Sequence, residues 1–106
     1  MILERLAKLM HDTAKEKGFW DGEYNYDKIG NKLALVHSEV TEVLEAIRKD
    51  KGQIAIVEEM SDVIIRILDI YQAMYEHGDI TISIEKVLKE KMETNRKREK
   101  LHGNKF

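Results

Sequence analysis

Apolar residues recur along the chain with the three-to-four-residue spacing of amphipathic helices. In the first segment, which runs from Ile2 to about Lys17, the large apolar positions are Ile2, Leu3, Leu6, Leu9 and Met10. The sequence contains no proline, and glycines follow helix-length blocks, as they commonly do at helix ends. The pattern therefore predicts four helices, at 2 to about 17, from between 25 and 31 to about 49, at 53 to 76, and from Thr81 or Ser83 to about 101.

These helices predict an all-α protein. Four helices joined by short connections are typical of a four-helix antiparallel bundle, and we expect residues 1–106 to form a single helical domain. The turn-rich, aromatic segment GFWDGEYNYD, residues 18–27, is expected to be a loop between the first two helices. The chain has no internal repeat, low-complexity tract or linker that would suggest a second domain.

The third predicted helix is apolar around much of its circumference. Its apolar positions cover roughly 220° of a helical wheel, whereas a helix that faces one core needs a stripe of only about 100°. We therefore expect a homo-oligomer, a dimer or tetramer, built on this helix. The alternative is a central helix that is buried within one protomer.

Composition narrows the function classes. The formal net charge is −2, which gives no general electrostatic attraction to nucleic acid or to an anionic membrane. The absence of cysteine excludes disulfides, thiolate metal sites and cysteine nucleophiles, and fits a reducing compartment. The longest apolar runs are only four residues, and the N-terminal segment lacks an apolar signal core, so we expect a mature, soluble, cytoplasmic protein.

Two pairs of acidic residues lie beside the apolar faces of the second and third helices. Glu39 and Glu42 are three residues apart on the second helix, and Glu59 and Asp62 have the same spacing on the third. Such pairs are common in a chain with 20 acidic residues among 106, and the simplest interpretation is a solvated surface. Their placement beside apolar faces is what singles out these two pairs.

If the four carboxylates converge, they must be neutralised. Two unit charges 5–8 Å apart repel by roughly 2–3 kcal/mol at an effective dielectric constant near 20. Protons, Arg66 or a metal could relieve this repulsion, and ligands that are all oxygen select a hard cation such as Mg²⁺ or Mn²⁺. A ferritin-like di-iron site is excluded, because it needs two Glu-x-x-His motifs and the chain has only Glu99-x-x-His102.

The segments LALVHSEVTEVLEAIRK and VEEMSDVIIRILD resemble the MazG-type, all-α nucleoside triphosphate pyrophosphohydrolases. That family carries E-x-x-E on one helix and E-x-x-D on the next. The resemblance implies that Glu39, Glu42, Glu59 and Asp62 bind Mg²⁺, with Mn²⁺ as a possible substitute. It also implies a dimeric or tetrameric bundle that cleaves a (d)NTP to (d)NMP and pyrophosphate, in which Glu39 or Glu42 activates the attacking water.

Most candidate substrate contacts lie outside the second and third helices, which carry the acidic pairs. Lys91, Asn95 and Arg98 share one face of the fourth helix and could contact phosphate or base, as similar residues do in relatives; the alternative is a solvated basic helix end. Trp20 could stack on a base, although hydrophobic anchoring of its loop is favoured. Arg66 could contact phosphate, but an ion pair with Asp62 one turn earlier is favoured.

Two other function classes remain open from the sequence. A non-catalytic helical interaction or regulatory module would explain the wide apolar arc and would need no metal. A nucleic-acid binder that uses the NRKREK stretch is disfavoured, because the chain has a negative net charge and no recognisable binding motif.

Overall fold

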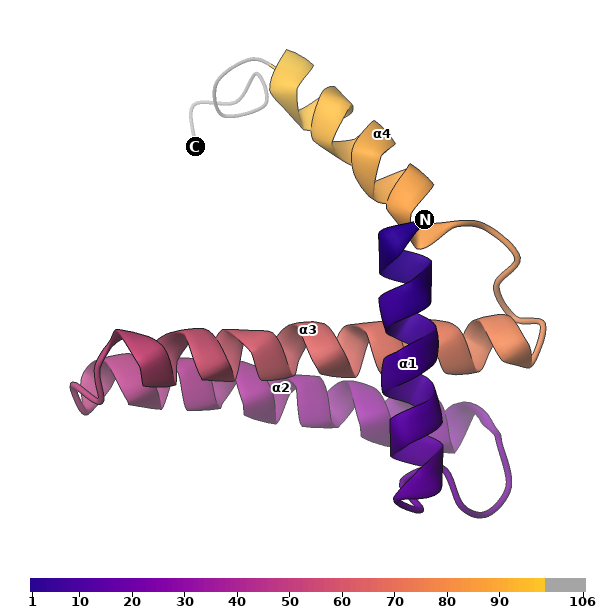
Figure 1. The fold of residues 1–106 in the computed structure, drawn as a ribbon, viewed down its shortest axis with the longest axis horizontal. Coiled ribbons are helices and arrows are strands. Elements are labelled where there is room, and N and C mark those ends of the chain that lie inside the picture. The colour runs from indigo at the N-terminus through magenta and orange to yellow at the C-terminus, as the bar shows by residue number, and fades with distance from the viewer. Residues whose placement is uncertain (99–106) are drawn as a thin grey trace.

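The structure is a computed structural model that describes residues 1–98, and all of its regular secondary structure is helical. The helices are α1 (Ile2–Glu16), α2 (Tyr26–Arg48), α3 (Gln53–Glu76) and α4 (Ile84–Lys97), as Figure 1 shows. This confirms the predicted all-α class and the order of the helices. The predicted end of the last helix, near Leu101, lies outside the described residues. No helix in the described part of the chain has both the length and the apolar character needed to cross a membrane.

Side-chain caps set the starts of α2 and α4, whereas α1 and α3 begin without one. Asn25 begins α2 by accepting a hydrogen bond from the Lys28 backbone N–H at 2.8 Å. Of the two candidate caps for α4, Ser83 is the one used, and its hydroxyl accepts from the Lys86 N–H at 3.1 Å. Two residues between α2 and α3 have a positive φ. Asp50, directly after the C-cap of α2, has a φ of 53°, and Gly52, the N-cap of α3, has a φ of 94°.

The long helices α2 and α3 lie side by side and run antiparallel, while α1 crosses this pair steeply (Figure 1). Helix α4 packs on the N-terminal end of α1 and projects away from the pair (Figure 1). The antiparallel arrangement thus holds for α2 and α3. One protomer does not place α1 and α4 alongside them as a closed bundle.

The buried core lies where α1 crosses α3. Ala7, Leu68 and Tyr71 form its centre, and Met10, Ile80 and Ile84 pack against them. Away from this crossing, most of the large apolar residues of α3 are exposed. The exposed fractions of Ile54, Val57 and Ile64 are 73%, 59% and 56%. The interpretation of α3 as a helix buried within one protomer is therefore wrong.

A reciprocal pair of carboxylates joins the N-termini of α1 and α4. Glu85 on α4 accepts a hydrogen bond from the Leu3 backbone N–H of α1 at 3.0 Å. In return, Glu4 on α1 accepts from the Glu85 backbone N–H at 3.1 Å and from the Ser83 hydroxyl. Each carboxylate thus satisfies a free N–H group at the start of the other helix. These contacts fix where α4 leaves the rest of the molecule.

Candidate metal centre and adjoining cleft

Three of the four predicted metal ligands meet where α2 packs on α3. One carboxylate oxygen from each of Glu39, Glu59 and Asp62 lies within 4.8 Å of the others. Glu39 comes from α2, and Glu59 and Asp62 come from consecutive turns of α3. The three-residue spacing points both α3 carboxylates in one direction, and the antiparallel packing brings Glu39 opposite them. We call these residues the acidic cluster.

Glu42, the fourth predicted ligand, stands outside this cluster. Its side chain is exposed on α2, one turn after Glu39. It is still close enough for its negative charge to act on Glu59. In one protomer the structure therefore brings together three of the four predicted acids and leaves Glu42 at their edge.

Arg66 pairs with Glu39 and not with Asp62. Its Nε donates to Glu39 Oε1 at 3.2 Å, across the interface between α3 and α2. The predicted ion pair within α3 is therefore wrong. The side chains of Arg66 and Glu39 are 30% and 18% exposed, so the pair is partly shielded from water. One of the three clustered carboxylates already has a cationic partner.

The remaining charges of the cluster repel one another. Burial raises the pKa of Glu59, and the negative charges of Asp62, Glu42 and Glu39 raise this pKa further. Glu39 and Glu59 are half-buried and Asp62 is exposed, and such a convergence of negative charges suits a divalent cation. Because every donor atom is oxygen, the set fits a hard cation of the Mg²⁺ or Mn²⁺ type.

A cleft of about 520 Å³ opens beside the acidic cluster. It is bounded by the crossing helix α1, the start of the following loop, α2 and the polar face of α3. Its lining residues are Leu9, Met10, Thr13, Ala14, Lys17, Phe19, Glu39, Asp62, Ile65, Arg66 and Asp69. The cleft thus combines an apolar wall from α1 with carboxylates and one arginine, and it is large enough for a small organic ligand.

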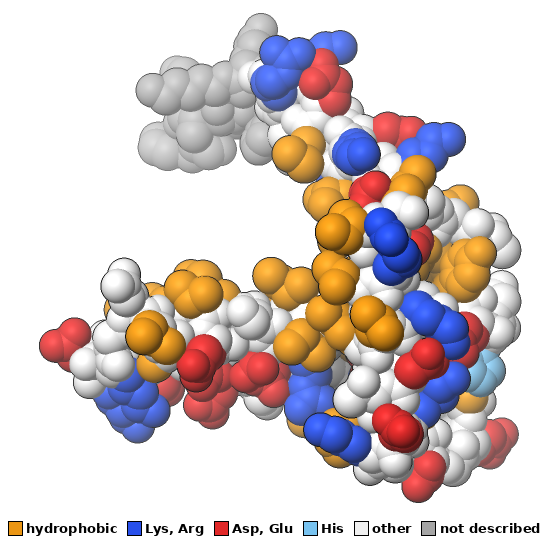
Figure 2. Space-filling model, viewed as in Figure 1, with side chains coloured by type: hydrophobic (Ala, Val, Ile, Leu, Met, Phe, Trp, Pro, Cys, Tyr) orange, Lys and Arg blue, Asp and Glu red, His pale blue; other side chains and the backbone are white. Residues whose placement is uncertain are grey.

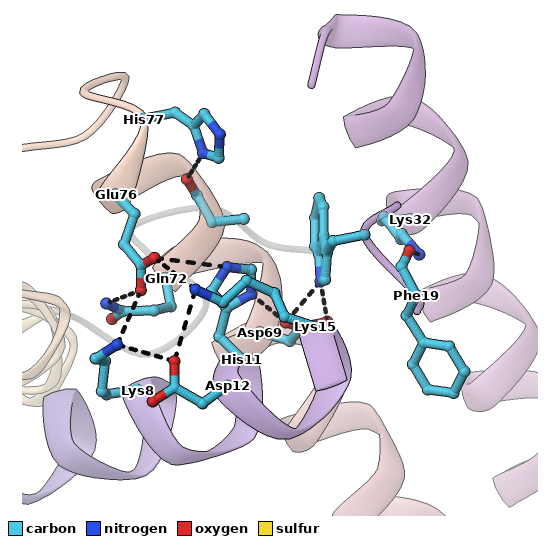
Figure 3. Close-up of polar contacts among 12 residues, drawn as sticks. Lys8, His11, Asp12, Lys15, Phe19, Lys32, Asp69, Gln72, Glu76 and His77 are labelled. Atoms are coloured by element: carbon cyan, nitrogen blue, oxygen red, sulfur yellow. Dashed lines mark hydrogen bonds and ion pairs between the residues drawn. The ribbon is translucent and has the colours of Figure 1, made fainter. Parts of the chain in front are cut away.

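A buried polar network ties α1 and the loop to α3 (Figure 3). Asp69 accepts hydrogen bonds from His11 Nδ1 at 2.7 Å and from Trp20 Nε1 at 2.9 and 3.1 Å. The rings of His11 and Trp20 meet edge to face, with centroids 5.2 Å apart. Trp20 therefore anchors its loop by hydrogen bonding as well as by apolar packing. It lines a separate cavity of about 250 Å³ and is not among the lining residues of the cleft.

The predicted contacts on α4 are not brought to the acidic cluster within one protomer. Lys91 and Asn95 are exposed on α4 and Arg98 is its exposed C-cap, and α4 projects away from α2 and α3 (Figures 1 and 2). Their distance from the cluster follows from the direction in which α4 leaves its junction with α1.

Sequence reasoning missed His11, Lys32 and Asp69. Asp69 could have been identified from the sequence, because it lies on the same face of α3 as Asp62 and Arg66. The spacings along this face are four and three residues. The sequence gives no such indication for His11 and Lys32, because their contacts depend on how α1 and the loop lie across the other helices.

A comparison with known proteins finds a match to the part of the chain that contains the acidic cluster. A family model described as "MazG nucleotide pyrophosphohydrolase domain" matches residues 28–102. No curated protein and no solved structure matches the chain. The matched range contains α2 from Lys28 onward, all of α3 and all of α4. Helix α1 and the loop that carries Trp20 precede it.

Proposed function

Because the chain belongs to the MazG nucleotide pyrophosphohydrolase domain family, we propose that it hydrolyses nucleoside triphosphates to the monophosphate and pyrophosphate with the help of Mg²⁺. The observation that carries this proposal is the acidic cluster on α2 and α3, which adjoins a cleft of about 520 Å³. An acidic site of this kind cannot bind a triphosphate without cations, because the two would repel each other.

Four carboxylates are proposed to hold the metal. Glu39, Glu59 and Asp62 already converge, and Glu42 lies at their edge with a charge that reaches Glu59. Bound Mg²⁺ would neutralise the carboxylates and the phosphate oxygens and would lower the pKa of a coordinated water. Mn²⁺ prefers the same oxygen ligands and is the expected substitute.

The chain's own residues would orient the substrate and move the proton. Glu42 or Glu39 is proposed to accept a proton from the water that attacks the α-phosphorus. Glu42 has the more accessible side chain, whereas Glu39 is held by Arg66. No covalent intermediate is required, in keeping with the lack of cysteine.

We further propose that the active form is a homo-oligomer, a dimer or tetramer. Large apolar side chains remain exposed on α3, including Ile54, Val57 and Ile64, and Val87, Leu88 and Met92 are exposed on α4. In Figure 2 hydrophobic side chains follow the inner, concave side of the molecule. A second protomer would bury them, and its α4 could bring Lys91, Asn95 and Arg98 to the substrate phosphates.

A nucleotide panel tests the proposed activity. The protein is incubated with the canonical ribo- and deoxyribonucleoside triphosphates and either Mg²⁺ or Mn²⁺, and released pyrophosphate and monophosphate are quantified. We expect equimolar monophosphate and pyrophosphate with both metals and no turnover in chelator. Release of inorganic phosphate with a diphosphate product would contradict the proposed bond cleavage.

The large exposed apolar surface is the observation that favours the second candidate, a non-catalytic helical interaction module. That module has no need for metal, so its melting temperature would be the same in chelator and in millimolar Mg²⁺. The proposed hydrolase is expected to melt at a higher temperature with Mg²⁺, because a cation that binds only the folded state stabilises it.

A further inference from the structure

The loop between α1 and α2, residues 17–25, forms part of the cleft but lies outside the range matched by the family. We call it the aromatic loop, since it contains Phe19, Trp20 and Tyr24. Its conformation is tied to every helix around it. The start of the loop is hydrogen-bonded to α1, because the Phe19 N–H donates to the Ala14 carbonyl at 3.0 Å.

Asp69 is the link between the aromatic loop and α3. This residue is only 6% exposed, and both of its carboxylate oxygens accept from the Trp20 indole N–H. The second partner, His11, is 1% exposed, and its Nδ1 lies 2.7 Å from Asp69 Oδ1. A buried carboxylate needs such partners, so the position of Trp20 is coupled to that of Asp69.

Two lysines of α2 hold the other side of the aromatic loop. Lys32 Nζ donates to the Phe19 carbonyl, and Lys28 Nζ donates to the carbonyls of Trp20 and Asp21. Lys32 Nζ also lies 4.9 Å from the centroid of the Trp20 ring. Burial lowers the pKa of Lys32, while the negative charge of Asp69 opposes this shift. The loop backbone is therefore fixed from both long helices.

This fixation decides which aromatic ring meets the cleft. Trp20 is turned toward His11 and Asp69 and lines the smaller cavity. Its neighbour Phe19 lines the cleft that also contains Glu39, Asp62 and Arg66. The Phe19 residue is 52% exposed, and Lys32 Nζ lies 5.8 Å from the centroid of its ring. An exposed ring beside the proposed metal site is suited to a ligand that is planar at one end and binds the metal through anionic groups at the other.

We propose that Phe19 is the planar contact for the base of the bound nucleotide, and that Asp69 is a positioning residue that holds Phe19 there through Trp20. This inference rests on the proposed function, because it assumes that a nucleotide occupies the cleft. Stacking of a base on an aromatic ring tolerates all bases, since each has a π face. Phe19 would then contribute affinity for nucleosides in general, while phosphate binding would depend on the metal site.

The first test compares a nucleotide with its phosphate portion alone. Binding of α,β-imido-dUTP and of inorganic triphosphate is measured by calorimetry with Mg²⁺, using wild type and Phe19→Ala. We expect Phe19→Ala to weaken α,β-imido-dUTP binding about tenfold, within the usual range for one base stack, and to leave triphosphate binding unchanged. The matched control is Tyr26→Ala, which removes another exposed ring, at the start of α2 and outside the cleft lining.

The second test asks whether Asp69 acts through Trp20. Asp69→Leu removes both acceptors, whereas Asp69→Asn can still accept from the indole N–H and donate to the other tautomer of His11. Trp20 is the only tryptophan, so quenching of its fluorescence by acrylamide reports the loop directly. We expect Asp69→Leu to increase quenching and to lose about tenfold in α,β-imido-dUTP affinity, and Asp69→Asn to resemble wild type in both.

The possible failures can be told apart. If wild type binds neither probe and turns over no nucleotide of the panel, the proposed function fails and this inference fails with it. If wild type binds both probes and Phe19→Ala binds α,β-imido-dUTP equally well, the inference alone is overturned. Because Asp69→Leu can fail to fold, thermal melts accompany each variant, and the exposed Phe19 substitution decides the matter on its own. Equal loss of affinity for triphosphate in Phe19→Ala would likewise contradict a base contact.

Discussion

Glu39 takes part both in an ion pair and in a cluster of like charges. Its carboxylate pairs with Arg66 and also lies within the acidic cluster, next to Glu59 and Asp62. The arginine neutralises one charge only, and the pKa of Glu59 is still raised by burial and by the neighbouring acids. Arg66 therefore offsets only part of the repulsion within the acidic cluster. A bound cation could offset the rest.

Neutralising Glu59 should stabilise the metal-free protein. In Glu59→Gln the amide keeps the side-chain volume but removes a charge that is unfavourable near Asp62, Glu42 and Glu39. We expect a melting temperature above that of wild type in chelator at pH 7, and a smaller increase on adding Mg²⁺. Scanning calorimetry with and without chelator measures both quantities. A lower melting temperature for Glu59→Gln in chelator would show that the acids do not repel one another.

Removing Glu42, one of the two candidate bases, should greatly reduce activity and leave the fold intact. Glu42→Gln is expected to reduce kcat for nucleotide hydrolysis at least ~100-fold, the scale of one general-base contribution. The matched control is Glu45→Gln, one turn further along α2, where within residues 1–98 the carboxylate forms ion pairs only with Arg48 and Lys49. This control should be nearly neutral. Equal damage from both variants in steady-state assays would contradict the assignment of Glu42.

At the scale of secondary-structure elements, the junction of α1 and α4 depends on exchanged caps. Hydrogen bonds from Ser83 and from the Glu85 backbone lower the pKa of Glu4, and the Leu3 backbone N–H lowers that of Glu85. A lowered carboxyl pKa means that the charged form is preferred in the folded state. Its contribution to the free energy of unfolding is present above the unfolded value near 4.5 and is lost as pH falls through the folded pKa.

Acid should therefore loosen the junction of α1 and α4. We expect the melting temperature of wild type to fall between about pH 5 and pH 3, across the range where carboxylates titrate. The double variant Glu4→Gln/Glu85→Gln should be less stable at pH 7 and should lose less stability over the same range. Glu90→Gln, an exposed position on α4, is the control. Parallel pH curves for wild type and the double variant would contradict this role of the caps.

At the scale of the whole molecule, the protomer leaves a large apolar surface without a protein partner in the described residues. The core at the crossing of α1 and α3 is small, and apolar side chains line the concave side between α3 and α4 (Figure 2). Contiguous apolar surface of this kind is typical of association sites. The same concave shape keeps the basic face of α4 away from the acidic cluster of its own protomer (Figure 1).

A charge on the exposed face of α3 should disrupt the proposed oligomer. Ile64→Glu places a carboxylate at a residue that is 56% exposed in the protomer and that we expect to be buried between protomers. The variant should dissociate toward the 12.4 kDa monomer in light scattering, since it forfeits about 2 kcal/mol of apolar burial and adds a buried charge. Thr41→Glu, on the outward polar side of α2, should not change the mass. Monomeric wild type at micromolar concentration would contradict the oligomer.

The oligomer also makes a kinetic prediction for α4. If a second protomer brings Lys91 to the substrate, Lys91→Ala should raise KM for the nucleotide several-fold with little change in kcat, because a phosphate contact exists in both the ground and transition states. Lys86→Ala, near the start of the same helix, is the control for loss of a positive charge. Identical KM values for wild type and Lys91→Ala would remove α4 from the proposed site.

The sequence by itself determined what depends on neighbouring residues along the chain. Helix number and most boundaries follow from periodicity and from caps such as Asn25 and Ser83, whose hydrogen bonds close within three residues. The shared direction of Glu59 and Asp62 follows from helical geometry alone. The wide apolar arc of α3 was equally visible, and the exposed isoleucines confirm that one protomer does not cover it.

Tertiary structure alone decided which of these residues meet. The choice of Glu39 over Glu42 as the partner of Glu59, and of Glu39 over Asp62 as the partner of Arg66, depends on how α2 is rotated against α3. The link from Asp69 to Trp20 spans 49 positions and needs α1 to cross α3. Crossing angles and helix rotations arise from side chains packing between elements, and an amphipathic pattern specifies only which face is covered, not by which neighbour or at what angle.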